Sequence, residues 1–181
     1  MPKAGPAPQA TAVLLLPDAA ATDALGGRIA AWIRGARRGL TVHLSGDLGA
    51  GKTSLARAVL RGLGVTGRIK SPTFTLLEPY VVQIPTDLDI RQNLSLYCYH
   101  FDFYRFTDPK EWLDAGFREY FDGQSLCLVE WPERAALSEH WPAPDLRISL
   151  EVAGPSRRAL LEAFGATGSA CLAAAVSSVR A

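Results

Sequence analysis

The chain has 181 residues, enough for one domain with a buried core and too few for two domains of ordinary length. Hydrophobic residues make up 48% of the sequence and charged residues 20%, a balance that excludes a disordered or fibrous chain. The sequence has 19 basic and 18 acidic side chains, which gives a formal net charge of +1. This charge provides no strong overall attraction to nucleic acid or anionic lipid.

The first predicted element is a helix over 24–37, with Thr22 or Asp23 as its cap and apolar residues at helical spacing. A short β-prone run over 40–44 leads into a glycine-rich loop, and 54–63 is predicted to be the helix that leaves this loop. Strand, loop and helix thus follow one another in the order of a P-loop.

Two more strands, over 74–82 and 94–101, are predicted to pair as a long antiparallel hairpin, because turn-forming residues separate them. The apolar run over 125–129 suits a buried parallel strand, and the alternating run over 146–150 suits a half-buried one. We therefore predict an α/β fold with a single P-loop NTPase-like domain, in which helices flank a central mixed sheet and an antiparallel hairpin is inserted.

The remaining segments carry weaker signals. A short helix is expected to begin at Pro109 and end near Gly116, followed by a second helical turn over 117–121. Residues 1–10 contain three prolines and are predicted to be a disordered leader. The domain is then expected over 11–164, and the small-residue segment 165–181 is interpreted as a C-terminal tail.

Cysteine usage and the N-terminal run bear on the compartment. Cys98, Cys127 and Cys171 are odd in number and widely spaced, which argues against a disulfide framework or a zinc site and fits a reducing compartment. The apolar run 12–16 ends at Pro17 and is too short for a signal-peptide core or a membrane span. We therefore expect a cytoplasmic protein without a membrane partner.

A local basic patch is the remaining direct route to nucleic acid. Arg57 and Arg61 share one face of the predicted helix over 54–63. Arg68 and Lys70 follow that helix closely. A solvated surface is the simpler interpretation of these charges, and contact with RNA or a partner is the alternative.

The glycine-rich loop carries the clearest chemistry, because residues 46–53 match the pattern G-x-x-x-x-G-K-[ST]. Its glycines permit backbone conformations closed to other residues and turn N–H groups toward phosphate oxygens. Lys52 would reach the β- and γ-phosphates of ATP, and the Thr53 hydroxyl would join a Mg²⁺ shell that keeps several waters. The residues expected to hold the nucleotide are Gly46, Asp47, Leu48, Gly49, Ala50, Gly51, Lys52, Thr53 and Ser54.

A P-loop enzyme also needs a carboxylate near the metal, at the end of a neighbouring strand. Glu130 follows the cleaner apolar strand, and Asp102 follows the run 96–101. Taken alone, either acid could equally be a helix cap or a surface residue. We expect Glu130 to bind the metal with Thr53 and Asp102 to orient or deprotonate the attacking water. Lys52 completes the expected catalytic set.

Other side chains near these positions have open interpretations. Ser71-Pro72-Thr73 could sense the γ-phosphate or form a plain turn. His100 lies among aromatic residues, and packing in the core is favoured over catalysis. For Trp131, core burial is favoured over stacking on a base.

The chain resembles the TsaE family, formerly YjeE, the ATPases of bacterial tRNA threonylcarbamoyladenosine synthesis. The resemblance runs from about Leu16 to Arg158, and four ordered blocks are more specific than a P-loop alone. These blocks cover 46–53, 70–76, 100–105 and 128–132. The resemblance implies an ATPase that uses ATP and Mg²⁺ and works with the partners TsaD and TsaB. TsaD carries the transfer chemistry, and tRNA is reached only through the complex.

The resemblance also implies roles for individual residues. In such proteins the residues matching Lys52 and Thr53 hold phosphates and Mg²⁺. The glutamate matching Glu130 serves the metal, and the aspartate matching Asp102 is needed for hydrolysis. The segment 18–22 and an arginine matching Arg157 or Arg158 lie near the adenosine, and we assign this arginine to Arg158.

This sequence departs from the family pattern between Tyr80 and Leu96. The hairpin there carries roughly ten extra residues, within the range that surface loops tolerate. None of the four matching blocks is interrupted. The insertion, over about 83–95, therefore bears on partner geometry rather than on ATP chemistry.

Two other functions compete with a coupled ATPase. A nucleotide-gated scaffold with incidental hydrolysis would use the same loop. A small-molecule kinase would need a second substrate pocket and an arginine-rich lid, for which the sequence offers no segment. A GTPase is disfavoured because the only asparagine, Asn93, precedes Leu94, so the N-K-x-D guanine signature is absent.

Overall fold

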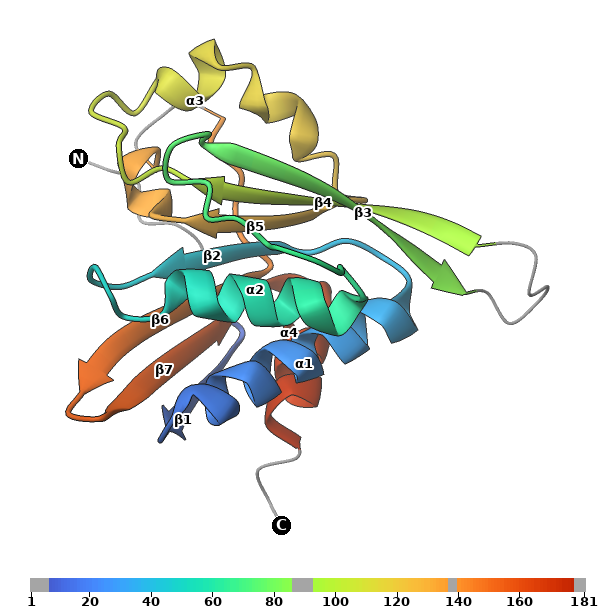
Figure 1. The fold of residues 1–181 in the computed structure, drawn as a ribbon, viewed down its shortest axis with the longest axis vertical. Coiled ribbons are helices and arrows are strands. Elements are labelled where there is room, and N and C mark those ends of the chain that lie inside the picture. Colours follow the sequence, from blue (N-terminus) through green and yellow to red (C-terminus); the bar gives the residue numbers. More distant parts are fainter. Residues whose placement is uncertain (1–6, 86–92, 137–139, 178–181) are drawn as a thin grey trace.

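The computed structural model describes residues 7–85, 93–136 and 140–177. Within these residues, seven strands form one sheet in the order β1-β7-β6-β2-β5-β4-β3 (Figure 1). The strands are β1 (Ala10–Leu16), β2 (Thr41–Ser45), β3 (Leu77–Pro85), β4 (Asn93–Asp102), β5 (Leu126–Glu130), β6 (Leu146–Ala153) and β7 (Ser156–Ala163). The α-helices are α1 (Ala19–Ala36), α2 (Lys52–Leu63), α3 (Glu111–Asp114) and α4 (Gly165–Val176). Single 3₁₀ turns span Phe117–Tyr120 and Pro132–Arg134.

The sheet is parallel in its centre and antiparallel at its edges. Strand β2 lies between β5 and β6 and runs parallel to both, and β4 runs parallel to β5. The pairs β3–β4, β6–β7 and β1–β7 are antiparallel. The predicted α/β fold with a central mixed sheet and an antiparallel hairpin is therefore confirmed. Parallel order brings the C-terminal ends of β2, β4 and β5 to the same edge of the sheet.

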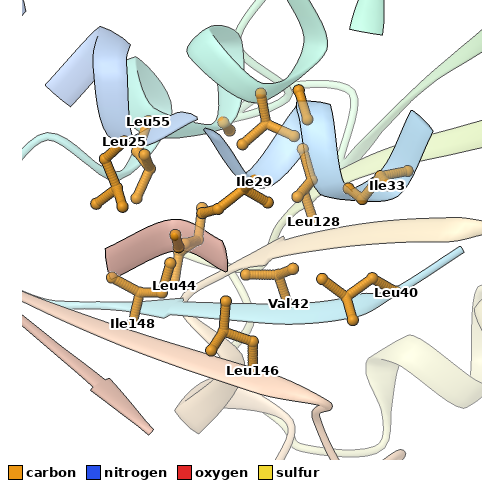
Figure 2. Close-up of a cluster of buried hydrophobic side chains, with 14 of the residues drawn as sticks. Leu25, Ile29, Ile33, Leu40, Val42, Leu44, Leu55, Leu128, Leu146 and Ile148 are labelled. Carbon is orange, nitrogen blue, oxygen red and sulfur yellow. The ribbon is translucent and has the colours of Figure 1, made fainter. Parts of the chain in front are cut away.

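Helices α1, α2 and α4 pack on one face of the sheet and enclose an aliphatic core (Figure 1). Figure 2 shows Leu25 and Ile29 of α1 above Leu44 of β2, with leucine and isoleucine side chains of β6 beside them. All of these side chains are nearly inaccessible to solvent. Removing about 100 Å² of apolar surface per side chain from water contributes about 2–3 kcal/mol each, so this face anchors the strand that precedes the loop.

The opposite face of the sheet is covered by an aromatic cluster that includes Phe101, Phe103 and Trp112. His43 of β2 points toward this face, with its ring 5.3 Å from that of Trp141. Burial lowers the pKa of His43 to about 3, and the nearby positive charge of Arg147 adds to the effect. The imidazole is therefore neutral at physiological pH and packs as an aromatic ring.

Several element boundaries differ from the sequence-based prediction: α2 begins at Lys52, α3 spans only Glu111–Asp114 and β6 extends to Ala153, and the starts of α1 and β3 also differ. Helix α1 begins at Ala19 rather than near residue 24, because the Asp18 carboxylate accepts a hydrogen bond from Ala21 N at 2.8 Å and caps the helix earlier. Its first turn is alanine-rich and lacks the apolar spacing that the prediction relied on. Strand β3 begins at Leu77 rather than at residue 74, because a bond from Leu76 N to Pro72 O at 2.7 Å closes a turn there.

The C-terminal segment contains a helix that the sequence analysis does not predict. Residues from Gly165 to Val176 form α4, whereas the sequence analysis predicts a tail over 165–181. Small residues gave no amphipathic pattern, yet they allow the helix to approach the sheet closely. A Cβ on Gly168 would lie 1.8 Å from Asp145 O. Arg28 of α1 donates from Nε to Ala175 O at 2.6 Å and ties α4 to the helical layer.

The expected leader and the expected hairpin insertion are only partly covered by the described residues. Strand β1 begins at Ala10, and Gln9 N donates to Ala163 O at 2.8 Å, so the end of the expected leader over 1–10 belongs to the sheet. Residues 1–6 lie outside the described residues. Residues 86–92, the central part of the expected hairpin insertion, also lie outside them.

Candidate nucleotide-binding site

The loop between β2 and α2 depends on glycine for its shape. Gly46, Gly49 and Gly51 have φ angles of 133°, 81° and 107°, a region that other residues rarely adopt. A Cβ on Gly46 would also lie 2.2 Å from Leu150 O of β6. Ala50 N donates to the Asp47 carbonyl at 3.1 Å and closes the turn. The loop can therefore present backbone N–H groups toward an anion at the start of α2.

Lys52 is the first residue of α2 and is buried. Its Nζ donates to the carbonyl oxygens of Gly46 at 2.5 Å and Asp47 at 2.9 Å, and it lies 3.8 Å from the centre of the Trp131 ring. Burial lowers the pKa of Lys52, whereas the surrounding carboxylates, Glu130 foremost, oppose this shift. The ammonium group is thus held inside the loop by uncharged partners and by nearby negative charge.

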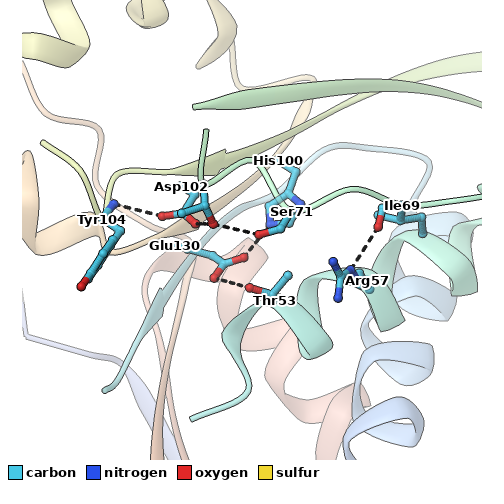
Figure 3. Close-up of polar contacts among 9 residues, drawn as sticks. Thr53, Arg57, Ile69, Ser71, His100, Asp102, Tyr104 and Glu130 are labelled. Carbon is cyan, nitrogen blue, oxygen red and sulfur yellow. Dashed lines mark hydrogen bonds and ion pairs between the residues drawn. The ribbon is translucent and has the colours of Figure 1, made fainter. Parts of the chain in front are cut away.

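Thr53 and Glu130 meet at the end of β5. Thr53 Oγ1 donates to Glu130 Oε2 at 2.8 Å (Figure 3). The other carboxylate oxygen, Oε1, lies 2.8 Å from His100 Nε2. Glu130 is 2% exposed and His100 is fully buried. His100 is therefore a buried core residue, as predicted, but it also contacts the site directly.

Asp102 ends β4 and pairs in register with Glu130 of β5. Its Oδ2 accepts a hydrogen bond from Thr73 Oγ1 at 2.7 Å, and its Oδ1 accepts one from Tyr104 N at 3.0 Å. Ser71 Oγ lies 2.9 Å from Thr73 Oγ1, so both hydroxyls of Ser71-Pro72-Thr73 belong to this network (Figure 3). The segment forms a turn whose hydroxyl groups contact the acid, and sensing of the γ-phosphate stays a prediction.

These side chains line a cleft of about 240 Å³, which we call the acidic cleft. It is defined by Lys52, Thr53, Thr73, Asp102, Glu130 and Trp131. Trp131 is half-buried here and not a full core residue. It adopts a left-handed backbone conformation with φ of 58°, which turns its ring toward Lys52. Because the cleft is open and polar, it suits charged phosphate groups better than an apolar ligand.

Another cleft, of about 360 Å³, lies on the other side of Gly51 and Ser54. We call it the arginine cleft, and its defining side chains are Asp18, Thr22, Asp23, Arg57, Arg61 and Arg157. Sequence reasoning had placed Arg57 and Arg61 in a surface patch and Asp23 at a helix cap. The spacing of Arg57 and Arg61 one turn apart, directly after the glycine loop, was the signal that could have assigned them to this cleft.

Of the two arginines that the family resemblance offers for the adenosine, Arg157 lines the arginine cleft and Arg158 does not. Successive residues of a strand point to opposite faces of the sheet. Ala159 of β7 faces the helical core, so Arg157 shares that side and lines the cleft. Arg158 points to the other face, where it is exposed and pairs in register with Glu151. Because β7 was not predicted, the alternation could not be read from the sequence.

A strand, a glycine-rich loop and a helix that begins with Lys52 and Thr53 stand beside acids at the ends of two neighbouring strands. This fold and this site define a P-loop NTPase-type protein. A family model described as "Threonylcarbamoyl adenosine biosynthesis protein TsaE" matches residues 16–160. The chain belongs to the TsaE family.

Similarity to individual proteins supports the same assignment. The tRNA threonylcarbamoyladenosine biosynthesis protein TsaE of Haemophilus influenzae is 44% identical over 97 residues, which is 54% of this chain and 54% of that protein. The chain thus spans about half the length of this relative. TsaE of Bacillus subtilis is 39% identical over 123 residues, 68% of each protein. The crystal structure of Bacillus subtilis YdiB superposes with a TM-score of 0.70 at 28% identity, covering 94% of this chain and 97% of that one.

Proposed function

We propose that this chain is a Mg²⁺-dependent ATPase subunit that acts in the cytoplasm with TsaD and TsaB in threonylcarbamoyladenosine modification of tRNA. The observation that carries the proposal is the convergence of Lys52, Thr53 and two strand-end acids on one cleft beside the glycine loop. The names of the relatives, which state a role in tRNA threonylcarbamoyladenosine biosynthesis, support the pathway. No helix in the part of the chain that the structure describes is long and apolar enough to cross a membrane.

ATP would lie across the loop, with its two ends in the two clefts. The loop N–H groups and Lys52 would bind the β- and γ-phosphates in the acidic cleft. The adenosine would enter the arginine cleft, where Arg157 and the start of α1 supply polar contacts. Gly51 and Ser54 line both clefts, so one extended ligand can bridge them.

The residues present fit a Mg²⁺ ion bound together with the nucleotide. Thr53 Oγ1 and Glu130 Oε2 are hard oxygen donors that lie 2.8 Å apart. Two protein oxygens leave room for phosphate and water ligands, which is how Mg²⁺ is usually bound in nucleotide sites. When bound, the ion would offset the negative charge that develops on the phosphates during hydrolysis.

Asp102 is the proposed base or orienting group for the attacking water. Its carboxylate is buried at the rim of the acidic cleft, and the bonds from Thr73 and Tyr104 fix its orientation. Each carboxylate oxygen has a second lone pair that can accept a proton from water. A fixed carboxylate of this kind contributes about 10²–10⁴-fold to a rate.

A nucleotide-gated scaffold remains the second candidate function, and one observation favours it. Phe74 is 82% exposed and directly follows Thr73, which contacts Asp102. A γ-phosphate that displaced Thr73 would therefore move an exposed aromatic side chain. Such a device would report nucleotide state to a partner, whether or not hydrolysis is needed.

Phosphate release tests these alternatives. We expect slow, Mg²⁺-dependent ATP hydrolysis by the isolated chain, and faster hydrolysis after addition of TsaD, TsaB and tRNA. Because the net charge is only +1, the isolated chain should bind tRNA weakly and in a salt-sensitive way. ATP-dependent association with TsaD and TsaB without phosphate release would instead support the scaffold. Absence of any complex in every nucleotide state would contradict both.

A further inference from the structure

His100 contacts the candidate metal ligand Glu130 from a neighbouring strand. In the register of β4 and β5, His100 pairs with Leu128, so Glu130 lies two residues further along on the same face. This diagonal places His100 Nε2 2.8 Å from Glu130 Oε1 in a region with almost no access to solvent. The opposite oxygen of the same carboxylate binds Thr53. A continuous chain of contacts thus runs from the imidazole to the first turn of α2.

The surroundings of the imidazole restrict where its proton lies. His100 Nδ1 is buried and has no hydrogen-bond partner among the described residues. A proton on Nδ1 would leave a buried donor unpaired and would turn the lone pair of Nε2 toward a carboxylate oxygen. A proton on Nε2 instead donates to Glu130 and leaves only an unpaired acceptor. The second arrangement is the one that the contacts favour.

We propose that His100 is a positioning residue, whose Nε2–H holds one oxygen of Glu130 so that the other is presented to Thr53 and Mg²⁺. Without this bond, the carboxylate could rotate away from the metal. Partners that orient metal ligands in this way typically change metal affinity by about 10–100-fold when they are lost. The inference rests on the proposed function of Glu130 as a metal-binding residue.

Two substitutions at this position separate orientation from packing. Leucine in His100→Leu fills part of the space and removes the donor. Glutamine in His100→Gln can place its side-chain NH₂ near the position of the imidazole Nε2 and keeps the donor. His43→Leu is the matched control, because His43 is the other buried histidine of the central strands and faces the aromatic side of the sheet.

Nucleotide binding at a series of Mg²⁺ concentrations gives the main readout, using a fluorescent ATP analogue that is hydrolysed slowly. We expect His100→Leu to raise the Mg²⁺ concentration for half-maximal binding by about 10-fold, with His100→Gln within about 3-fold of the unsubstituted chain. His43→Leu should leave the Mg²⁺ concentration for half-maximal binding unchanged. In a Glu130→Ala background, His100→Leu should add no further shift, because both changes remove the same ligand. An unchanged Mg²⁺ requirement in folded His100→Leu, or equal losses in both variants, would overturn the proposal.

A measurement without nucleotide tests the same inference independently of the proposed function. Nitrogen-15 labelling of the 3 histidines allows NMR to identify which ring nitrogen carries the proton, and His100→Gln assigns the signal by its loss. We expect protonation of Nε2 in the unsubstituted chain. Protonation of Nδ1 alone would refute the bond to Glu130 even if ATP hydrolysis were normal. Failure of ATP binding together with an Nε2 proton would instead contradict the proposed function.

Discussion

The acidic cleft and the arginine cleft lie on opposite sides of the same loop and differ in the elements that form them and in the burial of their charged side chains. The acidic cleft is formed by the ends of β4 and β5, and its carboxylates are buried and fixed by hydrogen bonds. The arginine cleft is formed by α1, α2 and β7, and its charged side chains are more accessible: Asp18, Asp23 and Arg61 are exposed, and Arg57 and Arg157 are half-buried. From this comparison we expect the acidic cleft to govern turnover and the arginine cleft to govern nucleotide affinity.

This difference predicts that affinity and turnover can be changed separately. Residues of the acidic cleft should affect hydrolysis or its metal requirement more than nucleotide affinity. Residues of the arginine cleft should do the opposite. Only a residue that contacts the phosphates from the loop itself should affect both properties strongly.

Lys52→Ala is expected to have the largest effect, because it removes the positive charge that would contact the phosphates both in bound ATP and during hydrolysis. ATP affinity should fall by about 10²–10³-fold, the scale of losing a buried charged contact, and hydrolysis should fall further. Titration with a labelled ATP analogue measures the affinity. Lys70→Ala, at an exposed lysine outside both clefts, is the control. Unchanged affinity in a folded Lys52→Ala protein would contradict the assignment of the loop.

Asp102→Ala tests the difference between the two clefts, because it should reduce turnover without changing ATP affinity. We expect kcat to fall by about 10²-fold or more, the usual effect of losing a positioned acid–base group, with ATP affinity nearly intact. Asp102→Asn keeps the shape and the contact with Thr73 while removing the charge, and it should show nearly the same loss. Single-turnover phosphate release measures the step. Normal hydrolysis in either variant would exclude a role for Asp102 in activating water.

Glu130→Ala should change the metal requirement rather than the chemistry at saturating metal. The Mg²⁺ concentration for half-maximal hydrolysis should rise by about 10-fold to 100-fold, because a carboxylate at the metal also sets its affinity. Glu133→Ala provides a control acid three residues away that accepts a bond from Ser45 instead. If Glu130→Ala and Asp102→Ala gave the same Mg²⁺ profile, the proposed separation of their roles would be wrong.

Arg157→Ala should have the smallest effect and test the other cleft. Loss of one charged, half-buried contact should weaken ADP binding by about 10-fold and leave kcat at saturating ATP nearly unchanged. Arg158→Ala is an adjacent control on the opposite face of β7 and should leave ADP affinity unchanged. Calorimetric titration of ADP measures both variants. A larger loss in Arg158→Ala would show that the nucleotide does not use the arginine cleft.

Sequence reasoning succeeded where the signal was local. The glycine loop, the helix after it and the strand ending at Glu130 are all contiguous patterns, so they could be placed before the structure was known. β1 and β7 could not be placed in this way, because their residues alternate only weakly and their pairing joins the two ends of the chain. The small residues of α4 gave no periodic pattern.

The contacts within the site required the register of the strands. Asp102 and Glu130 could be nominated as strand-end acids, but only the pairing of β4 with β5 shows that they lie side by side. The same register explains why His100 reaches Glu130, a contact between residues 30 positions apart in the chain. The residues around His100 in the sequence do not reveal a diagonal contact with another strand. The sequence therefore predicts only that His100 packs in the core.

The close contact between α1 and α2 has an electrostatic consequence. A Cβ on Gly26 would lie 2.4 Å from Ala58 Cβ, and one on Gly62 would lie 2.7 Å from Ala30 Cβ. The contact further along α1 is also the one further along α2, so the two helices run parallel (Figure 1). Residues at the start of each helix line the arginine cleft. Side by side, their aligned macrodipoles repel by about 0.5 kcal/mol for each pair of ends, at a separation of about 9 Å and an effective dielectric constant of about 20.

That repulsion is smallest when the paired ends meet opposite charge. At the C-terminal ends, Arg34 Nη1 donates to Leu63 O at 3.0 Å and offsets the paired negative ends. At the N-terminal ends, the Asp18 carboxylate already caps α1, and the phosphates of a nucleotide bound at the glycine-rich loop would add negative charge at the start of α2. A nucleotide should therefore draw the two helices into a more stable pair, and amide hydrogens along their contact should exchange more slowly when it is bound.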